Sequence, residues 1–221
     1  MALAVSLYGV SFGALSVISG FSLAQTMVLS LVMFSGASQF ALIGIIAAGG
    51  PAAAVAAVFS ASLLGMRNGL YALRMSPIVQ PAGPLRIIAA HLTVDESTAV
   101  GTAQPSVRAG RVGFWTTAVA LFIGWNLMTL AGALLGDILG DVRAYGLDAA
   151  AAAAFLGLVW PWLKSGEPTI AALGAAVLTV VLVPAVPAGI PVLVVAVVAI
   201  VFGLYRHRVN PHEPARDEEL S

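Results

Sequence analysis

The first 66 residues of the chain contain no Asp, Glu, Lys, Arg or His, and Arg67 is the first side chain that can carry a charge. A helix needs only about 20 apolar residues to cross a bilayer, so this stretch is long enough for about three crossings. Charged residues make up 9% of the chain and hydrophobic residues 60%, whereas soluble domains are roughly a quarter charged. So few charges cannot cover a soluble domain, and the sequence predicts a membrane protein.

Backbone amides inside a bilayer must find their hydrogen-bond partners within the same segment, so long apolar segments predict helices rather than open strands. We therefore expect an all-α integral membrane protein with about seven transmembrane helices. Their expected positions are 3–19, 25–49, 51–73, 113–135, 147–163, 168–183 and 189–204. These helices form a membrane domain over residues 1–204, which a charged cytoplasmic tail follows over residues 205–221.

Basic residues predict the orientation of the helices, because positively charged loops stay in the cytoplasm. Four arginines lie in or beside the connection 76–112, which is therefore expected to be cytoplasmic. They are Arg74, Arg86, Arg108 and Arg111. Arg206 and Arg208 follow the last predicted helix and place the C-terminus on the same side. Counting back through three predicted helices places the N-terminus outside.

Two parts of the chain resemble each other. Gly13-Ala14-Leu15 is matched by Gly132-Ala133-Leu134. Ser35 follows Gly20 by fifteen residues, and helix-breaking Pro161 follows Gly146 by the same number. The two helix-disturbing positions therefore coincide when the two glycines are aligned.

This similarity predicts a first repeat over residues 3–75, a second over residues 113–184 and a final helix over residues 188–204. Three helices per repeat is an odd number, so the second repeat would be inverted in the membrane. Inverted repeats with interrupted helices near the midplane are typical of proteins that bind a ligand at mid-depth. Small residues also recur wherever membrane helices pack closely, and so few matches can arise by chance.

The run Ser35, Gly36, Ala37, Ser38 and Gln39 is the first candidate site. Its hydroxyls, amide and exposed backbone groups could bind the two ends of a zwitterion, as broken helices do in membrane proteins. Close packing of small residues against a neighbouring helix is the simpler explanation of the same run.

Arg67 is the most informative single residue, because it lies inside the predicted helix 51–73 and is followed by Asn68. A charge inside the membrane marks a pathway or a buried partner by default, and a guanidinium can hold a carboxylate with two parallel hydrogen bonds. Arg67 could also extend to the headgroups from near the cytoplasmic end of its helix. Asn126 is a weaker candidate that could simply bond a neighbouring helix.

His91, Asp95 and Glu96 form a second polar group. His91 and Asp95 are four residues apart, so a continuous helix would place them on one face, where an imidazole and a carboxylate could relay protons. A solvated cytoplasmic helix explains these residues more simply. If the segment folds back toward the membrane, one of its carboxylates is the expected partner of Arg67.

Several classes of function are excluded. The chain has no cysteine and a net charge of zero, so zinc–thiolate sites, thiol nucleophiles and a basic surface for nucleic acid are not expected. We found no glycine-rich phosphate loop, metal-ligand cluster or catalytic triad. The sequence therefore predicts neither an enzyme nor a bound cofactor.

Five motifs together resemble the AzlC family, the large subunits of branched-chain amino acid exporters. They are Tyr8-Gly9-Val10-Ser11-Phe12-Gly13, Phe34-Ser35-Gly36-Ala37-Ser38-Gln39-Phe40, Arg67-Asn68-Gly69-Leu70-Tyr71, Asp95-Glu96 and Gly146-Leu147-Asp148. The resemblance implies export of valine, leucine and isoleucine, with methionine as a further candidate, coupling to protons, and location in the bacterial inner membrane. It also implies a small AzlD-like membrane subunit as partner. The alternative is a non-transporting scaffold or regulatory subunit of a transport complex.

Overall fold

The computed structural model describes residues 2–139, 156, 160, 163, 166–186 and 190–209, and their regular structure is entirely helical. The chain divides into two units, Met1–Pro161 and Trp162–Ser221. Most of the predicted helix 147–163, including Pro161, and most of the tail 205–221 lie outside the described residues.

Among the described residues, two helical stretches are long and apolar enough to cross a membrane, Pro51–Val79 and Val107–Gly136. The first consists of the short helix η1 (Pro51–Ala53) and α5 (Ala54–Val79). The second belongs to α8 (Val107–Leu139), whose 33 residues span about 50 Å. The other apolar helices of the described residues are shorter.

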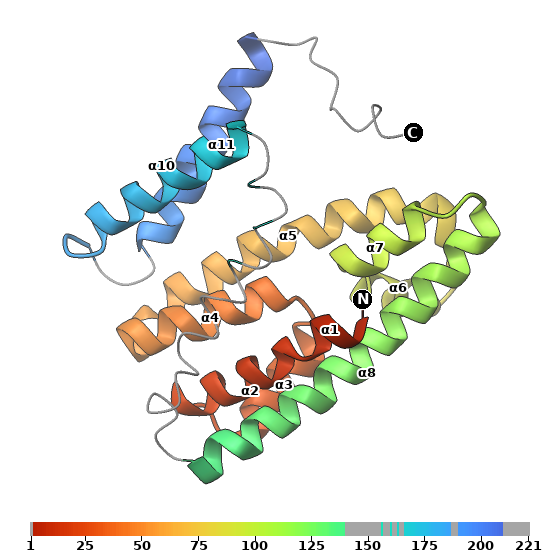
Figure 1. Ribbon diagram of the computed structural model, residues 1–221, viewed down its shortest axis with the longest axis horizontal. Coiled ribbons are helices and arrows are strands. Elements are labelled where there is room, and N and C mark those ends of the chain that lie inside the picture. The colour runs from red at the N-terminus through yellow and green to blue at the C-terminus, as the bar shows by residue number, and fades with distance from the viewer. Residues whose placement is uncertain are drawn as a thin grey trace. The chain divides into compact units, whose positions relative to one another are not determined.

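The chain begins with α1 (Ala2–Ser6) and α2 (Tyr8–Ile18), which pack along α8 in the same direction (Figure 1). Ser6 lies against Gly124 and Ala14 lies against Gly136, so the residue numbers rise together along the two helices. The start of α2 therefore points to the same end of the bundle as the start of α8 and the basic connection before it. The sequence predicts that the N-terminus and the basic connection lie on opposite sides of the membrane. This prediction is wrong, because the predicted helix 25–49 between them does not cross.

The matching Gly-Ala-Leu triplets lie where α2 and α8 touch. A Cβ on Gly13 would overlap the carbonyl oxygen of Thr129, and a Cβ on Gly132 would overlap that of Val10. Small residues allow backbones to approach this closely. Since the two helices are parallel, the prediction that the segments 3–19 and 113–135 are inverted copies is wrong, and close packing explains their similarity.

The predicted helix 25–49 is a helical hairpin rather than one crossing. It consists of α3 (Leu23–Val32) and α4 (Gly36–Gly49). The side-chain amide of Gln39 in α4 donates a hydrogen bond of 3.2 Å to the carbonyl of Leu29 in α3. Ten residues of straight helix would separate these groups by about 15 Å, so the chain must reverse between the two helices.

Local sequence explains where this hairpin begins and turns. Ser22 caps α3 in a reciprocal pair with Gln25, which satisfies the first backbone amides of the helix. The α3 helix ends at Val32, the backbone of Met33 leaves the helical region, and Ser35 is extended with φ −156° and ψ 98°. An interruption in this segment is therefore confirmed, but it covers residues 33–35, and the run from Gly36 to Gln39 forms the first turn of α4.

A second hairpin lies in the predicted cytoplasmic connection 76–112. It consists of α6 (Leu85–His91) and α7 (Asp95–Thr102), joined through residues 92–94. The ring of His91 lies 5.8 Å from that of Phe122, halfway along α8. At its other end, α7 brings Gly101 against Gly110, near the beginning of α8. The α6–α7 hairpin thus enters to mid-depth and returns.

The tips of the two hairpins meet. The Nε2–H of His91 donates a hydrogen bond of 2.9 Å to the carbonyl of Leu31, which is sixty residues away in the sequence. The Phe34 ring lies 6.1 Å from His91 and 5.1 Å from Phe122. The break at residues 33–35 therefore faces a second break at residues 92–94, in a segment expected to be a solvated loop. Pro161, its predicted counterpart, lies outside the described residues.

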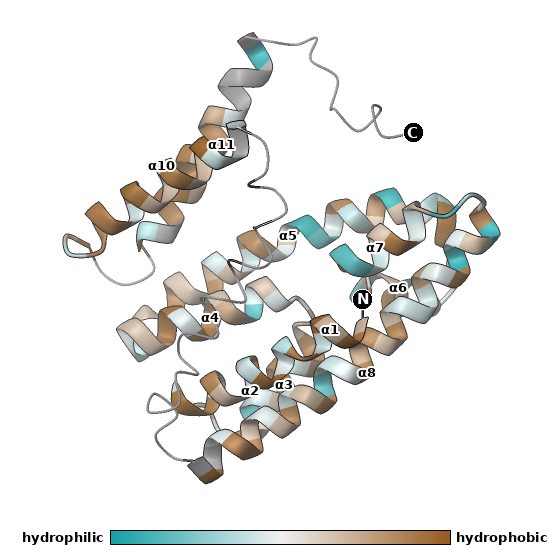
Figure 2. Cartoon of the chain, in the orientation of Figure 1, coloured by the Kyte–Doolittle hydropathy of each residue, from teal (hydrophilic) through white to brown (hydrophobic). Residues whose placement is uncertain are grey.

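The second unit contains α10 (Gly166–Leu182) and α11 (Ile190–Val209), where two of the predicted helices were expected. In the first unit, hydrophilic residues interrupt the apolar helices where α5 passes α7 (Figure 2). These residues belong to the candidate site.

Candidate functional site

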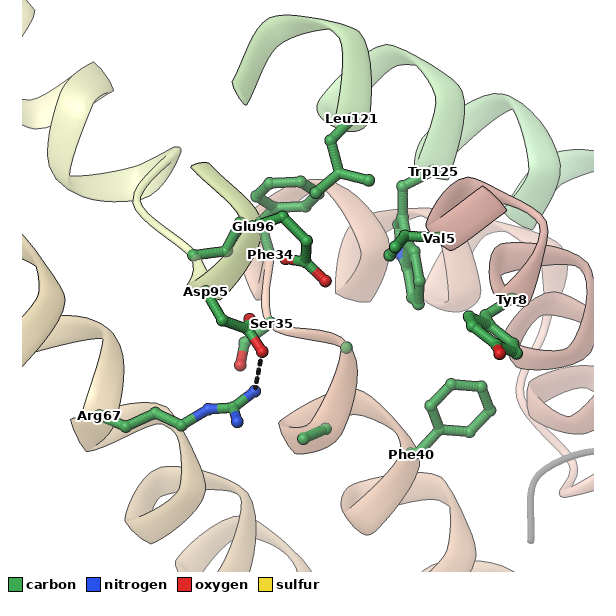
Figure 3. Close-up of a pocket in the computed structure, with 13 residues that line it drawn as sticks. Val5, Tyr8, Phe34, Ser35, Phe40, Arg67, Asp95, Glu96, Leu121 and Trp125 are labelled. Carbon is green, nitrogen blue, oxygen red and sulfur yellow. Dashed lines mark ion pairs between the residues drawn. The ribbon is translucent and has the colours of Figure 1, made fainter. Parts of the chain in front are cut away.

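A small cavity of about 40 Å³ lies between the hairpin tips. The break before α4, the first turn of α7, and side chains from α1, α2, α5 and α8 enclose it (Figure 3). The lining residues are Val5, Tyr8, Phe34, Ser35, Gly36, Ala37, Phe40, Arg67, Val94, Asp95, Glu96, Leu121 and Trp125. Six of the eleven residues expected to form the site are thus brought together from three separate segments.

Arg67 and Asp95 form an ion pair at the edge of this cavity, with 3.6 Å between Nη2 and Oδ2. The sequence-based prediction of a carboxylate partner for Arg67 is therefore confirmed. The two side chains are 36% and 38% exposed, so solvent screening limits the pair to about 1 kcal/mol of stability or less. The Nε–H of Arg67 is buried and has no partner among the described residues.

Glu96 is the most deeply buried charged residue described, at 8% exposure. It lies in α7, in the connection between the crossing helices α5 and α8. The pKa of Glu96 is raised to about 7, chiefly by burial and also by the negative charge of neighbouring Asp95, whereas Arg67 acts in the opposite direction. The prediction that this segment is a solvated helix is wrong, because α7 packs against α5 and α8.

The N-terminus of α4 has no cap. Ser35 occupies the N-cap position but forms no side-chain cap bond, and its hydroxyl bonds that of Ser38 instead, at 3.0 Å. The first backbone amide to find a partner is that of Gln39, which donates to the Ser35 carbonyl. The amides of Gly36 and Ala37 are thus left without partners in the described part of the chain, beside the cavity.

Aromatic side chains form the wall opposite the charges (Figure 3). The ring of Trp125 lies 6.4 Å from Phe40 and 6.3 Å from Phe12, and Tyr8 completes this side. Gly36 leaves room for the indole, because a Cβ at this position would lie 3.2 Å from Trp125 Cη2. The cavity therefore has a charged wall and an apolar wall.

Ser38, Asn68 and His91 line a different cavity, of about 310 Å³, on the other side of the tips. His91 ends α6 and Asp95 begins α7, so they share no continuous helical face. The expectation of a His91–Asp95 relay on one helix is wrong, because the break at residues 92–94 separates them.

Gln39 and Asn126 line neither cavity. Gln39 is fully buried and braces α4 against α3 through its bond to Leu29. Asn126 donates to the carbonyl of Phe122, one turn earlier in α8, at 2.8 Å. Their side-chain oxygens, Gln39 Oε1 and Asn126 Oδ1, have no partner among the described residues.

The sequence did not single out the apolar wall. Tyr8 and Phe40 belong to motifs that carry the family resemblance, and Trp125 is the neighbour of the weaker candidate Asn126. An aromatic residue in a membrane helix gives no sign of whether it faces lipid, another helix or a cavity. As for metals, the described residues contain no group of three or more His, Cys, Asp or Glu that could hold an ion.

Apolar crossing helices, together with breaks that meet around a polar cavity, are features of helical membrane proteins of the transport class. Comparison with known proteins agrees. The family model described as AzlC protein matches residues 1–139, which include both hairpins and α8. The chain belongs to the AzlC family, which is associated with branched-chain amino acid transport. No curated protein and no solved structure matches the chain.

Proposed function

We propose that this protein exports valine, leucine and isoleucine, with methionine as a further substrate, across the bacterial inner membrane. The cavity between the hairpin tips is the proposed binding site. The observation that carries the proposal is its two unlike walls: Arg67, Asp95 and Glu96 on one, Phe40 and Trp125 on the other. A zwitterion with an apolar side chain needs this combination.

The charged wall can recognise an amino acid. The substrate ammonium faces Asp95 and Glu96, while its side chain lies against the aromatic residues. The ion pair between Arg67 and Asp95 balances the charge of the empty site, so substrate entry exchanges one set of charge contacts for another. With Glu96 protonated, the empty site can therefore close without burying an unpaired charge, which would be costly.

The cavity volume suggests how transport proceeds. About 40 Å³ has room for about three waters, which is less than an amino acid needs. Binding thus requires the hairpin tips to separate, and the tips are joined by only a few contacts, chiefly His91 with Leu31 and with Phe34. Movement of one hairpin at a time would expose the site to one side and then to the other.

Glu96 is the proposed proton carrier. Its pKa of about 7 allows proton exchange near neutral pH, and its place beside the ammonium subsite links protonation to substrate binding. Asp95 changes partner between Arg67 and substrate, and His91, at the junction of the tips, is a further candidate for the proton path. The basic connection with Arg86, Arg108 and Arg111 is proposed to be cytoplasmic, as is the C-terminal tail.

Export assays test this proposal. Cells that express the chain, alone and with a small AzlD-like subunit, are loaded with labelled valine, and its release is followed. We expect faster release than from cells without the chain, and loss of release in Asp95→Asn at unchanged protein level. Release independent of the chain in both settings would instead indicate a non-transporting scaffold or regulatory subunit.

A further inference from the structure

The uncapped N-terminus of α4 lies at the cavity, yet no residue that the structure describes uses its donors. Gly36 and Ala37 both line the cavity, and neither amide has a partner in the described residues. The first three amides of a helix have no acceptor within the helix and carry the positive end of its dipole. The first turn of α4 contains no acidic residue that could neutralise it.

A second unused donor belongs to Trp125, a residue that lines the same cavity. Trp125 is 5% exposed, and its indole Nε1–H is buried without a partner among the described residues. A buried indole N–H usually finds an acceptor, and leaving it unpaired is costly. A Cβ on Gly36 would lie 3.2 Å from Cη2 of the same indole, so the residue with the free backbone donor and the residue with the free indole donor lie beside each other.

The N-terminus of α7, which faces the same cavity, differs in one respect. Asp95 and Glu96 occupy its first turn, so this helix end already has negative charge of its own. The Val94 amide before it is also satisfied, because it donates to Ser97 Oγ at 3.0 Å. One helix end therefore attracts an anionic group, whereas the other presents carboxylates to a cationic group.

We infer that the α4 N-terminus and the Trp125 indole N–H form the subsite for the substrate's carboxylate. Arg67 is the counter-ion of Asp95 in the empty site and is not the principal carboxylate ligand. The amino acid thus lies with its carboxylate on the α4 tip and its ammonium on the α7 tip. It bridges the two hairpins and favours their closure around it. This inference rests on the proposed function and adds the orientation of the substrate.

Two substitutions at Gly36 separate donor from bulk. Both Gly36→Ala and Gly36→Pro add a Cβ near Trp125, but only proline removes the backbone N–H. Proline is well tolerated at the first position of a helix, and the extended backbone of Ser35 suits the residue before a proline. The measurement is binding of labelled leucine to the purified full chain, together with its partner subunit if binding requires it.

We expect Gly36→Pro to bind leucine about 10- to 100-fold more weakly than Gly36→Ala, as loss of a hydrogen bond to a charged group implies. Trp125→Phe, which keeps an aromatic ring but lacks the N–H, should also bind more weakly than wild type. Leucinamide, which has no carboxylate, should compete poorly with leucine for the wild-type protein.

The outcomes distinguish the two proposals. Equal affinity of Gly36→Pro and Gly36→Ala for leucine would overturn the carboxylate subsite while leaving the exporter proposal intact. If Gly36→Pro does not fold, wild-type affinity in Trp125→Phe would overturn the subsite by itself. Absence of leucine binding by the wild-type protein would instead contradict the proposed function.

Discussion

Gly13→Ala should destabilise the protein, because Gly13 lies at the closest approach of α2 and α8. A Cβ at this position would lie 2.7 Å from the backbone nitrogen of Ala133 and closer still to the carbonyl oxygen of Thr129. Real Cβ atoms essentially never approach other atoms within 3.0 Å, and backbone atoms cannot rotate away as a flexible side chain can. The two helices would have to separate along their contact.

Gly44→Ala is the matched control. Gly44 also lies inside a helix, α4, but a Cβ there would meet nothing within 4 Å. Both substitutions gain the same helix propensity, about 0.5–1 kcal/mol, so the difference between the two variants isolates the overlap. Overpacking typically costs about 1–3 kcal/mol, and each kcal/mol shifts Tm by about 2–4 °C in a chain of this size.

Thermal unfolding of the two variants in detergent, followed by circular dichroism, measures this difference. We expect Tm to be several degrees lower for Gly13→Ala than for Gly44→Ala. Equal Tm values would refute the parallel packing of α2 on α8, and with it the placement of the start of α2 at the same end as the basic connection.

Three further predictions concern the site and the hairpins. Arg67→Lys should lose most export activity at normal protein level, because lysine lacks the planar fork of the guanidinium, and Arg67→Ala should do no worse. Wild-type transport by the lysine variant would show that the pair with Asp95 needs only a positive charge at position 67. Glu96 has a raised pKa, so the folded protein binds the Glu96 proton more tightly than the unfolded chain, and stability should fall as pH rises from 4.5 to about 7. Glu96→Gln should flatten this pH dependence of Tm. An unchanged pH profile of Tm in the variant would speak against a buried carboxyl. The chain has no native cysteine, so single cysteines can be placed at chosen positions. Cysteines at Phe21 and Ala52 should react with an impermeant thiol reagent from the same side of the membrane, and cysteines at Ala82 and Ser106 from the opposite side. Reaction of the first two from opposite sides would instead show a single crossing over residues 25–49.

The helical class, the break in the segment 25–49 and the carboxylate partner of Arg67 could all be predicted from the sequence. Each depends on a strong local signal: the long uncharged stretch, the run of small polar residues, and the cost of a charge among apolar residues. The direction of the chain after a break has no such signal. The segment 25–49 carries no charge on either side of its break, and the bond between Gln39 and Leu29 shows that it reverses.

The sequence did not predict the α6–α7 hairpin, because the local signal at its tip is misleading. Its tip contains His91, Asp95 and Glu96, and such polarity is typical of a solvated loop. Burial is possible because other elements satisfy these groups: the Leu31 carbonyl accepts from His91, and Arg67 pairs with Asp95. Contacts between residues sixty positions apart do not appear in any local pattern, so the site itself could be predicted only in parts.

Protection of a single cysteine by substrate tests the central claim most directly, namely that branched-chain amino acids bind between the hairpin tips. Ala37→Cys places a thiol in the cavity, and Ser62→Cys, in the larger cavity beyond the tips, serves as the control. Leucine should slow the reaction of a thiol reagent at position 37 and leave the rate at position 62 unchanged, and glycine, without an apolar side chain, should protect much less. Equal rates at position 37 with and without saturating leucine would contradict the claim.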